Sequence, residues 1–148
     1  MISADWAAGY GTPLEASTHS DLAVVGIIGA HRTEFDQLAP NLPTTLYQVT
    51  VQLTVRGASP KTIIVTQTGG LINGTMYHVD GDPMMQTGER SLLFLKHVVG
   101  GPYDGSYFVI GGPTGRYDVQ SDDTVTSPGV SVAAGTTLAG VLASLSTR

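Results

Sequence analysis

The chain contains no cysteine among its 148 residues. Disulfide bonds and thiolate metal sites are therefore excluded, because both need cysteine sulfur. The absence of disulfides does not fix the compartment, since a small secreted domain can fold without them.

Charged residues are also scarce. Asp, Glu, Lys and Arg make up 13% of the chain, Lys61 and Lys96 are its lysines, and the net charge is −5. Proteins that bind nucleic acids or anionic membranes need clusters of basic residues, which this sequence lacks. No apolar run approaches the ~18 residues of a membrane-spanning helix. We therefore expect no nucleic-acid partner and no membrane span.

Glycine, threonine and valine take the place of the missing charge. The 19 glycines and 8 prolines favour tight turns, and threonine and valine favour strands. With 41% hydrophobic residues, the chain is too apolar to be disordered. These features predict an all-β protein with a core of its own.

The clearest strand is residues 45–56, TLYQVTVQLTVR. Alternate positions carry apolar side chains, and the positions between them carry Gln and Thr. This period of two predicts one dry face and one wet face. The dry face is predicted to consist of Tyr47, Val49, Val51, Leu53 and Val55.

The stretch 22–30, LAVVGIIGA, is nearly continuous and apolar, so it predicts a strand buried on both faces, with bulges at Gly26 and Gly29. Further strands are predicted at residues 61–68, 91–99, 106–110, 116–120 and 130–134, and a hairpin turn at Asn73-Gly74.

Two short helices are predicted near the ends of the chain. Thr12 followed by Pro13 is typical of a helix start, and Thr136-Thr137 can cap a helix over residues 138–145.

This order of elements favours an OB-like five-stranded Greek-key barrel with one or two short helices, in which the Asn73-Gly74 hairpin is inserted between the third and fourth strands. A β-sandwich is the alternative. We divide the chain into an N-terminal segment with a short helix (1–20), the barrel (21–126) and a C-terminal extension with a short helix (127–148).

An ordered set of motifs resembles a class of uncharacterised exported bacterial domains with an OB-like barrel. The resemblance covers about residues 20–125, through the segments SDLAVVG (20–26), YQVTV (47–51), IVTQTGG (64–70), VDGDP (79–83), GERSLLFL (88–95), YFVIGG (107–112) and GRY (115–117). It implies an OB-like barrel in a secreted or cell-surface protein, and no particular activity.

The same arrangement is distantly similar to the inhibitory domain of tissue inhibitors of metalloproteinases. That family inhibits through an N-terminal cysteine that chelates the zinc of the protease. This chain has no cysteine, so the mechanism does not carry over.

The segment HVDGDP holds the best metal candidate, His78 with Asp80 and Asp82. Alternating acids around a glycine can offer oxygen ligands to Ca²⁺, and a nearby histidine suits Zn²⁺. The alternative, which we favour, is a turn in which both acids accept hydrogen bonds from backbone amides.

A binding face is the other candidate site. It would use the loops at residues 69–83 and 100–105, with Tyr77, His78, Asp80, Asp82, Tyr103 and Asp104 as its residues. Without basic neighbours it would suit a protein or carbohydrate partner. For Tyr47, Tyr107 and Tyr117 we favour a packing role with the hydroxyl at the rim of the barrel.

The sequence has neither the G-x-S-x-G motif of hydrolases nor the H-E-x-x-H motif of metalloproteases. We therefore expect a non-enzymatic structural or interaction module without a cofactor. A ligand-binding or protease-inhibitor-like module is the alternative, and a metal-dependent hydrolase is the third possibility.

Overall fold

Five strands form a closed barrel in a computed structural model that describes residues 10–35, 43–79 and 81–146. They are β1 (Leu22–Phe35), β2 (Pro43–Arg56), β3 (Thr62–Ile72), β5 (Arg90–His97) and β6 (Tyr107–Val109). The sheet order is β1-β2-β3-β6-β5, and β5 pairs with β1 to complete the ring. All neighbours are antiparallel except β3 and β6, which are parallel. The predicted all-β class and OB-like barrel are confirmed.

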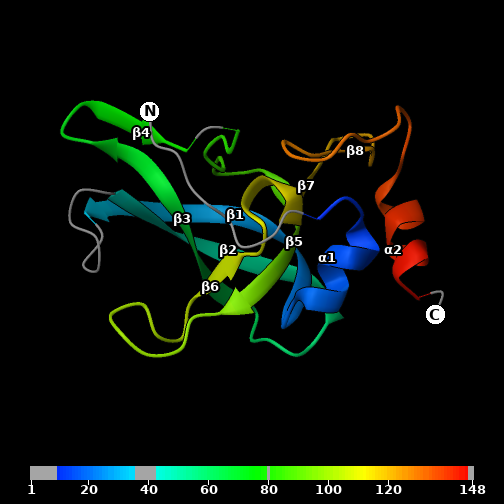
Figure 1. The fold of residues 1–148 in the computed structure, drawn as a ribbon, viewed down its shortest axis with the longest axis horizontal. Coiled ribbons are helices and arrows are strands. Elements are labelled where there is room, and N and C mark those ends of the chain that lie inside the picture. Colours follow the sequence, from blue (N-terminus) through cyan, green and yellow to red (C-terminus); the bar gives the residue numbers. More distant parts are fainter. Residues whose placement is uncertain (1–9, 36–42, 80, 147–148) are drawn as a thin grey trace.

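Smaller elements decorate this barrel (Figure 1). They are α1 (Pro13–His19), β4 (Thr75–His78), the 3₁₀ turn η1 (Gly112–Gly115), β7 (Arg116–Val119), β8 (Val125–Thr126) and α2 (Leu138–Ser146). The helices α1 and α2 lie next to each other on one side of the barrel, and the hairpin of β3 and β4 projects at the opposite end. No helix in the described ranges has the length and apolar character needed to cross a membrane.

The strands β1 and β5 separate two hydrophobic cores. In β1, Leu22 and Val24 face the barrel interior, whereas Ala23 and Val25 face the layer that contains α1 and α2. In β5, Leu93 and Leu95 face inward, whereas Leu92 and Phe94 face the helices. The prediction that residues 22–30 include a strand buried on both faces is confirmed over its first half, and the reason is this second core.

Glycines allow β1 to bend around the barrel. The register against β2 shifts between Val25 and Gly26 and again between Ile28 and His31. A Cβ on Gly26 would lie 2.6 Å from Cγ1 of Val49 and 2.9 Å from the carbonyl oxygen of Thr50. The predicted bulges therefore exist, and β2 passes too close to this strand for a larger residue.

The dry face predicted for β2 is only partly dry. Tyr47 and Val49 are buried, Val51 and Val55 are half-buried, and Leu53 is 48% exposed. The ladder between β2 and β3 ends at the pair Thr50–Thr62. Beyond that point β2 runs past the end of the barrel interior, which is why the prediction for Leu53 is wrong.

The local turn and cap signals act as predicted. Oγ1 of Thr12 accepts a hydrogen bond from the backbone N–H of Glu15 at 3.2 Å, and α1 begins at Pro13. Asn73 and Gly74 both have positive φ, as a type I′ turn requires. Oγ1 of Thr137 accepts from the N–H of Gly140 at the start of α2.

The end of the barrel sequence differs from the prediction. Residues 130–134 form no strand, whereas Val125 and Thr126 form β8 against β7. Val130 and Val132 instead pack as half-buried side chains on the core under the helices. Packing alone is enough to explain their apolar character, and this is why the pattern was misleading.

Two buried tyrosines differ in their hydrogen bonding. The hydroxyl of Tyr47 donates to the carbonyl of Met85 at 2.9 Å inside the barrel. The hydroxyl of Tyr117 is buried against the helices and has no hydrogen-bond partner among the described residues. Burial raises the pKa of both to about 12. Both rings pack as predicted, but neither hydroxyl is at the rim.

We expect Gly26→Ala to lower the free energy of unfolding by about 1–3 kcal/mol, because the new methyl group overpacks the contact with Val49. Chemical denaturation measures the change. Gly11→Ala is the matched control, since a Cβ there meets nothing within 4 Å. Equal stability of the two variants would contradict the close approach of β1 and β2.

We expect Tyr47→Phe to destabilise the fold by about 1–2 kcal/mol, because it leaves the buried carbonyl of Met85 without its donor. Tyr117→Phe removes a hydroxyl that has no partner, so its effect should be neutral or stabilising. Denaturation of both variants provides the comparison, and a larger loss for Tyr117→Phe would refute the assignment.

Candidate functional site

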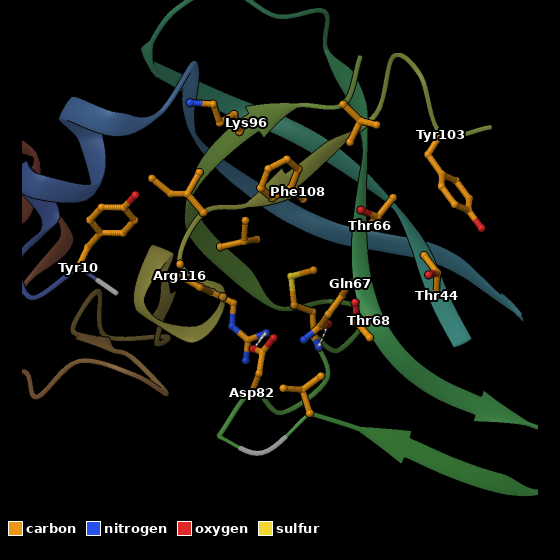
Figure 2. A pocket seen from close by; sticks show the side chains of 17 residues that line it. Tyr10, Thr44, Thr66, Gln67, Thr68, Asp82, Lys96, Tyr103, Phe108 and Arg116 are labelled. Carbon is orange, nitrogen blue, oxygen red and sulfur yellow. Dashed lines mark hydrogen bonds and ion pairs between the residues drawn. The ribbon is translucent and has the colours of Figure 1, made fainter. Parts of the chain in front are cut away.

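A cavity of about 630 Å³ lies where β3 changes its partner, and we call it the β3–β6 cavity. β3 pairs with β6 at Val65 and Thr66, and with β4 from Gly69 onward. Gln67 and Thr68 lie between these two ladders, and both line the cavity. Figure 2 shows their side chains beside the opening. The cavity thus follows from the sheet topology, because diverging strands leave the wall of the barrel incomplete.

The loop between β4 and β5 closes the bottom of this cavity, and side chains from the barrel hold it. Nε2 of Gln67 donates to the carbonyl of Pro83 at 3.0 Å, and Oε1 of Gln67 accepts from the N–H of Met85 at 3.0 Å. Tyr47 binds the carbonyl of Met85 from the barrel interior. The amide side chain of Gln67 therefore bonds one backbone carbonyl and one backbone N–H of the loop, as the backbone of a neighbouring strand would do. The side chain of Met85 itself is buried in the interior core.

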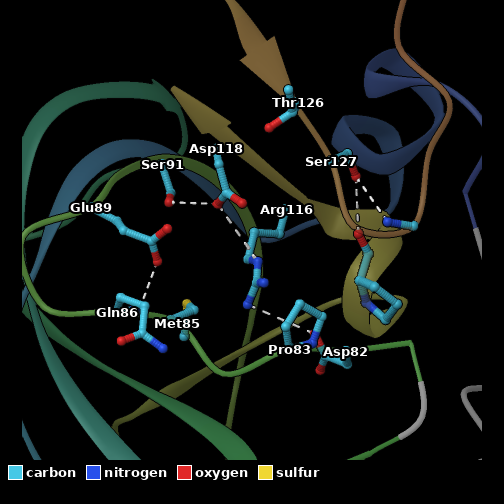
Figure 3. A network of polar contacts seen from close by, with 12 residues as sticks. Asp82, Pro83, Met85, Gln86, Glu89, Ser91, Arg116, Asp118, Thr126 and Ser127 are labelled. Carbon is cyan, nitrogen blue, oxygen red and sulfur yellow. Dashed lines mark hydrogen bonds and ion pairs between the residues drawn. The ribbon is translucent and has the colours of Figure 1, made fainter. Parts of the chain in front are cut away.

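A buried arginine lies at the base of the cavity. Arg116 is the first residue of β7, directly after η1, and it is 4% exposed. Its Nη1 is 3.8 Å from Oδ1 of Asp82, and its Nε is 3.7 Å from Oδ1 of Asp118 (Figure 3). Both distances are too long for hydrogen bonds. Within the described part of the chain, the buried Nε has no hydrogen-bond partner.

The two carboxylates beside Arg116 have different surroundings. Oδ1 of Asp118 accepts a hydrogen bond from the hydroxyl of Ser91 at 3.2 Å. Asp82 is buried, and this burial raises the pKa of its carboxyl, while the guanidinium of Arg116 opposes the rise. The net direction is upward, so desolvation outweighs the attraction of the neighbouring cation.

The walls of the cavity combine apolar and hydroxyl groups. The ring of Phe108 is 41% exposed and lies beside the opening, with Tyr10 and Tyr103 at the margins (Figure 2). Thr66 and Thr68 contribute hydroxyl groups from β3, and the exposed side chain of Lys96 also lines the cavity. The arrangement can therefore offer apolar contact at the sides and charged hydrogen-bonding groups at the base.

The predicted site residues fall into separate places. Asp82 and Tyr103 both line the cavity. The ring of Tyr77 lies on β4 in edge contact with Phe35, with centroids 6.5 Å apart. Oδ1 of Asp104 accepts from the N–H of Gly100 at 2.6 Å, which fixes the turn in its own loop.

The remaining two predicted residues, His78 and Asp80, belong to the metal candidate. His78 pairs with Gly69 through the backbone of β4, and Asp80 lies outside the described residues. The described residues contain no group of three His, Asp or Glu side chains placed to hold a metal ion. Asp82 lies beside the guanidinium of Arg116. The metal site made of His78, Asp80 and Asp82 stays a prediction.

Sequence reasoning missed Gln67 and Arg116. The signal for Gln67 was present, because the inward positions of β3 are Ile63, Val65 and then a glutamine, and a polar residue on a buried face needs a partner. Arg116 gave no comparable signal, since its partner Asp82 is distant in the sequence.

We expect the Asp82 carboxyl to stabilise the fold increasingly as the pH falls. Its pKa in the folded protein is raised above the ordinary 3.8, so this contribution is fully present below that value and is lost as the pH rises through the raised pKa. The difference in unfolding free energy between wild type and Asp82→Asn should therefore shift in favour of wild type on acidification. Denaturant titrations at a series of pH values test this, and a shift in the opposite direction would rule it out.

The chain matches no family model, no curated protein and no solved structure in three comparisons. The closed five-stranded barrel is compatible with an OB-like domain, and this is the part of the predicted resemblance that the structure supports.

Proposed function

We propose that this protein is a non-catalytic binding module that holds a small polar group of its partner in the β3–β6 cavity. The observation that carries the proposal is the buried Arg116, whose guanidinium lies beside the carboxylate of Asp82 in the lining of an open cavity of about 630 Å³. Cavities of this size, with mostly apolar walls and a few converging polar groups, are typical of ligand sites.

The rigidity of the site supports binding. Gln67 holds the loop on one side and Tyr47 holds it on the other, so Asp82 is presented by a segment with fixed backbone bonds. A site fixed before the ligand arrives loses less conformational entropy on binding.

The surroundings of the titratable groups favour binding over catalysis. Asp82 and Asp118 both lie against Arg116, and Asp118 also accepts from Ser91. The exposed ring of His97 is stacked on Tyr107, with centroids 4.7 Å apart. These groups have structural partners, whereas a general base needs reach to the proton that it removes.

We retain export to the cell exterior as part of the proposal, on the basis of the motif resemblance described for residues 20–125. A secreted or cell-surface position would give this module access to protein or carbohydrate partners outside the cell.

We expect Thr68→Tyr to weaken ligand binding by at least ~10-fold, since a large ring at this exposed position fills the mouth of the cavity without disturbing the core. The ligand is sought by following backbone amide shifts in nuclear magnetic resonance spectra during titration with sugars, amino acids, nucleosides, short peptides and inorganic phosphate. Ligands should shift the amides of Gln67 and Gly111.

Thr62→Tyr is the matched control, because Thr62 is exposed on the same strand and lies outside the cavity lining. It should bind as wild type does. Shifts that are equally strong in both variants, or the absence of shifts with every class of compound, would refute a binding role for the cavity.

A further inference from the structure

We infer that the β3–β6 cavity selects a neutral polyhydroxylated ligand, a sugar residue, and discriminates against anions. The inference rests on the proposed binding function and adds the chemical class of the ligand. It follows from three features of the cavity: its balance of charge, the spacing of its donor and acceptor, and the nature of its walls.

The charges at the base do not favour an anion, although an arginine is present. Arg116 lies between the carboxylates of Asp82 and Asp118, so negative groups outnumber positive ones there. Lys96, which also lines the cavity, brings the total close to neutrality. An anionic group approaching the guanidinium would meet Asp82 at the same place, and like charges at such short range repel. A neutral ligand does not incur this repulsion.

The gap between Arg116 and Asp82 suits a hydroxyl group. Nη1 and Oδ1 are 3.8 Å apart, and an oxygen atom can lie at about 2.8 Å from both. A hydroxyl is able to accept from the guanidinium and donate to the carboxylate at the same time. An ionised carboxylate can only accept, so beside Asp82 it would place a second acceptor of the same charge and donate nothing to it. Neighbouring hydroxyl groups on one ring could use both Asp82 and Arg116 in this way.

The walls suit the other half of a sugar. The exposed ring of Phe108 lies beside the opening, and the rings of Tyr10 and Tyr103 border it from two other segments (Figure 2). The C–H faces of a pyranose are apolar and pack against aromatic rings, while its hydroxyl groups point outward to polar partners. The cavity offers apolar contact at its sides and paired polar groups at its base. These two kinds of surface match the apolar faces and the hydroxyl groups of a sugar.

The test compares neutral monosaccharides with the matching uronic acids, and with inorganic phosphate and acetate, by amide shifts of the intact protein. We expect a neutral sugar to shift the amides of Gln67, Asp82 and Gly111 with a dissociation constant of about 1 mM. Its uronic acid should bind several-fold more weakly. This comparison needs no variant.

Asp82→Asn provides the second arm. It keeps the shape of the side chain and removes the negative charge of the acceptor. An anion that approaches Arg116 is then no longer repelled by the carboxylate at position 82. We expect the neutral sugar to lose about 10-fold in affinity and the uronic acid or phosphate to gain relative to it. Asp122→Asn, at a fully exposed carboxylate, is the control for net charge and should behave as wild type does.

The outcomes separate the two proposals. Tighter binding of phosphate, acetate or a uronic acid than of any neutral sugar would overturn the sugar inference and leave the binding function in place. Binding of short peptides with no response to sugars would do the same. An unchanged preference for neutral sugars in a folded Asp82→Asn protein would overturn the role of the hydroxyl gap. If no probe shifts the amides of the cavity residues, both proposals are refuted.

Discussion

The pairing of β1 with β5 is the constraint on which the rest of the structure depends. This antiparallel ladder runs from Leu22–Leu95 to Ile27–Arg90 and closes the barrel. Both strands are apolar on both faces, so the ladder simultaneously forms a wall of the interior core and the base of the core beneath the helices. Each of the two cores covers one face of the β1–β5 ladder. The helices α1 and α2 are consequently part of the hydrophobic structure, because without them Val25 and Phe94 would face water.

Closure on one side leads to an opening on the other. β6 is short and pairs with β3 through Val65 and Thr66, after which β3 continues toward its hairpin with β4. The chain after β6 turns through η1 and returns to β5 as β7. The cavity occupies the space between these diverging paths, and Gln67 supplies the hydrogen bonds that the missing strand would have made to the loop. The position of the site is therefore set by topology, and its chemistry by the side chains that line the gap.

Local signals predicted local structure well. Thr12 with Pro13, Asn73 with Gly74, and the alternation in β2 each identified an element whose geometry is decided by a few adjacent residues. The exposure of Leu53 and the irregular path of residues 130–134 depend on where a neighbouring strand ends or a helix packs, and no local pattern carries that information. The same limit applies to the site. Asp82 and Tyr103 were identified as candidates from their loops, but the contact with Arg116 joins distant segments that only the closed barrel brings together.

Two successive residues, Arg116 and Tyr117, each bury a polar atom without a hydrogen bond among the described residues, and the two side chains differ in what surrounds that atom. Tyr117 points into the core under the helices, where its ring packs edge-on against Phe94 and contributes apolar area whatever its hydroxyl does. Arg116 has no such compensation, because its charge is desolvated and its ion pairs are long. Buried ion pairs of this kind are often no more stabilising than well-packed apolar residues of similar volume. Packing alone therefore does not explain an arginine at this position. The guanidinium instead lies in the lining of the cavity, close to the carboxylate of Asp82 but not bonded to it, and this placement is the reason for proposing that the cavity binds a ligand.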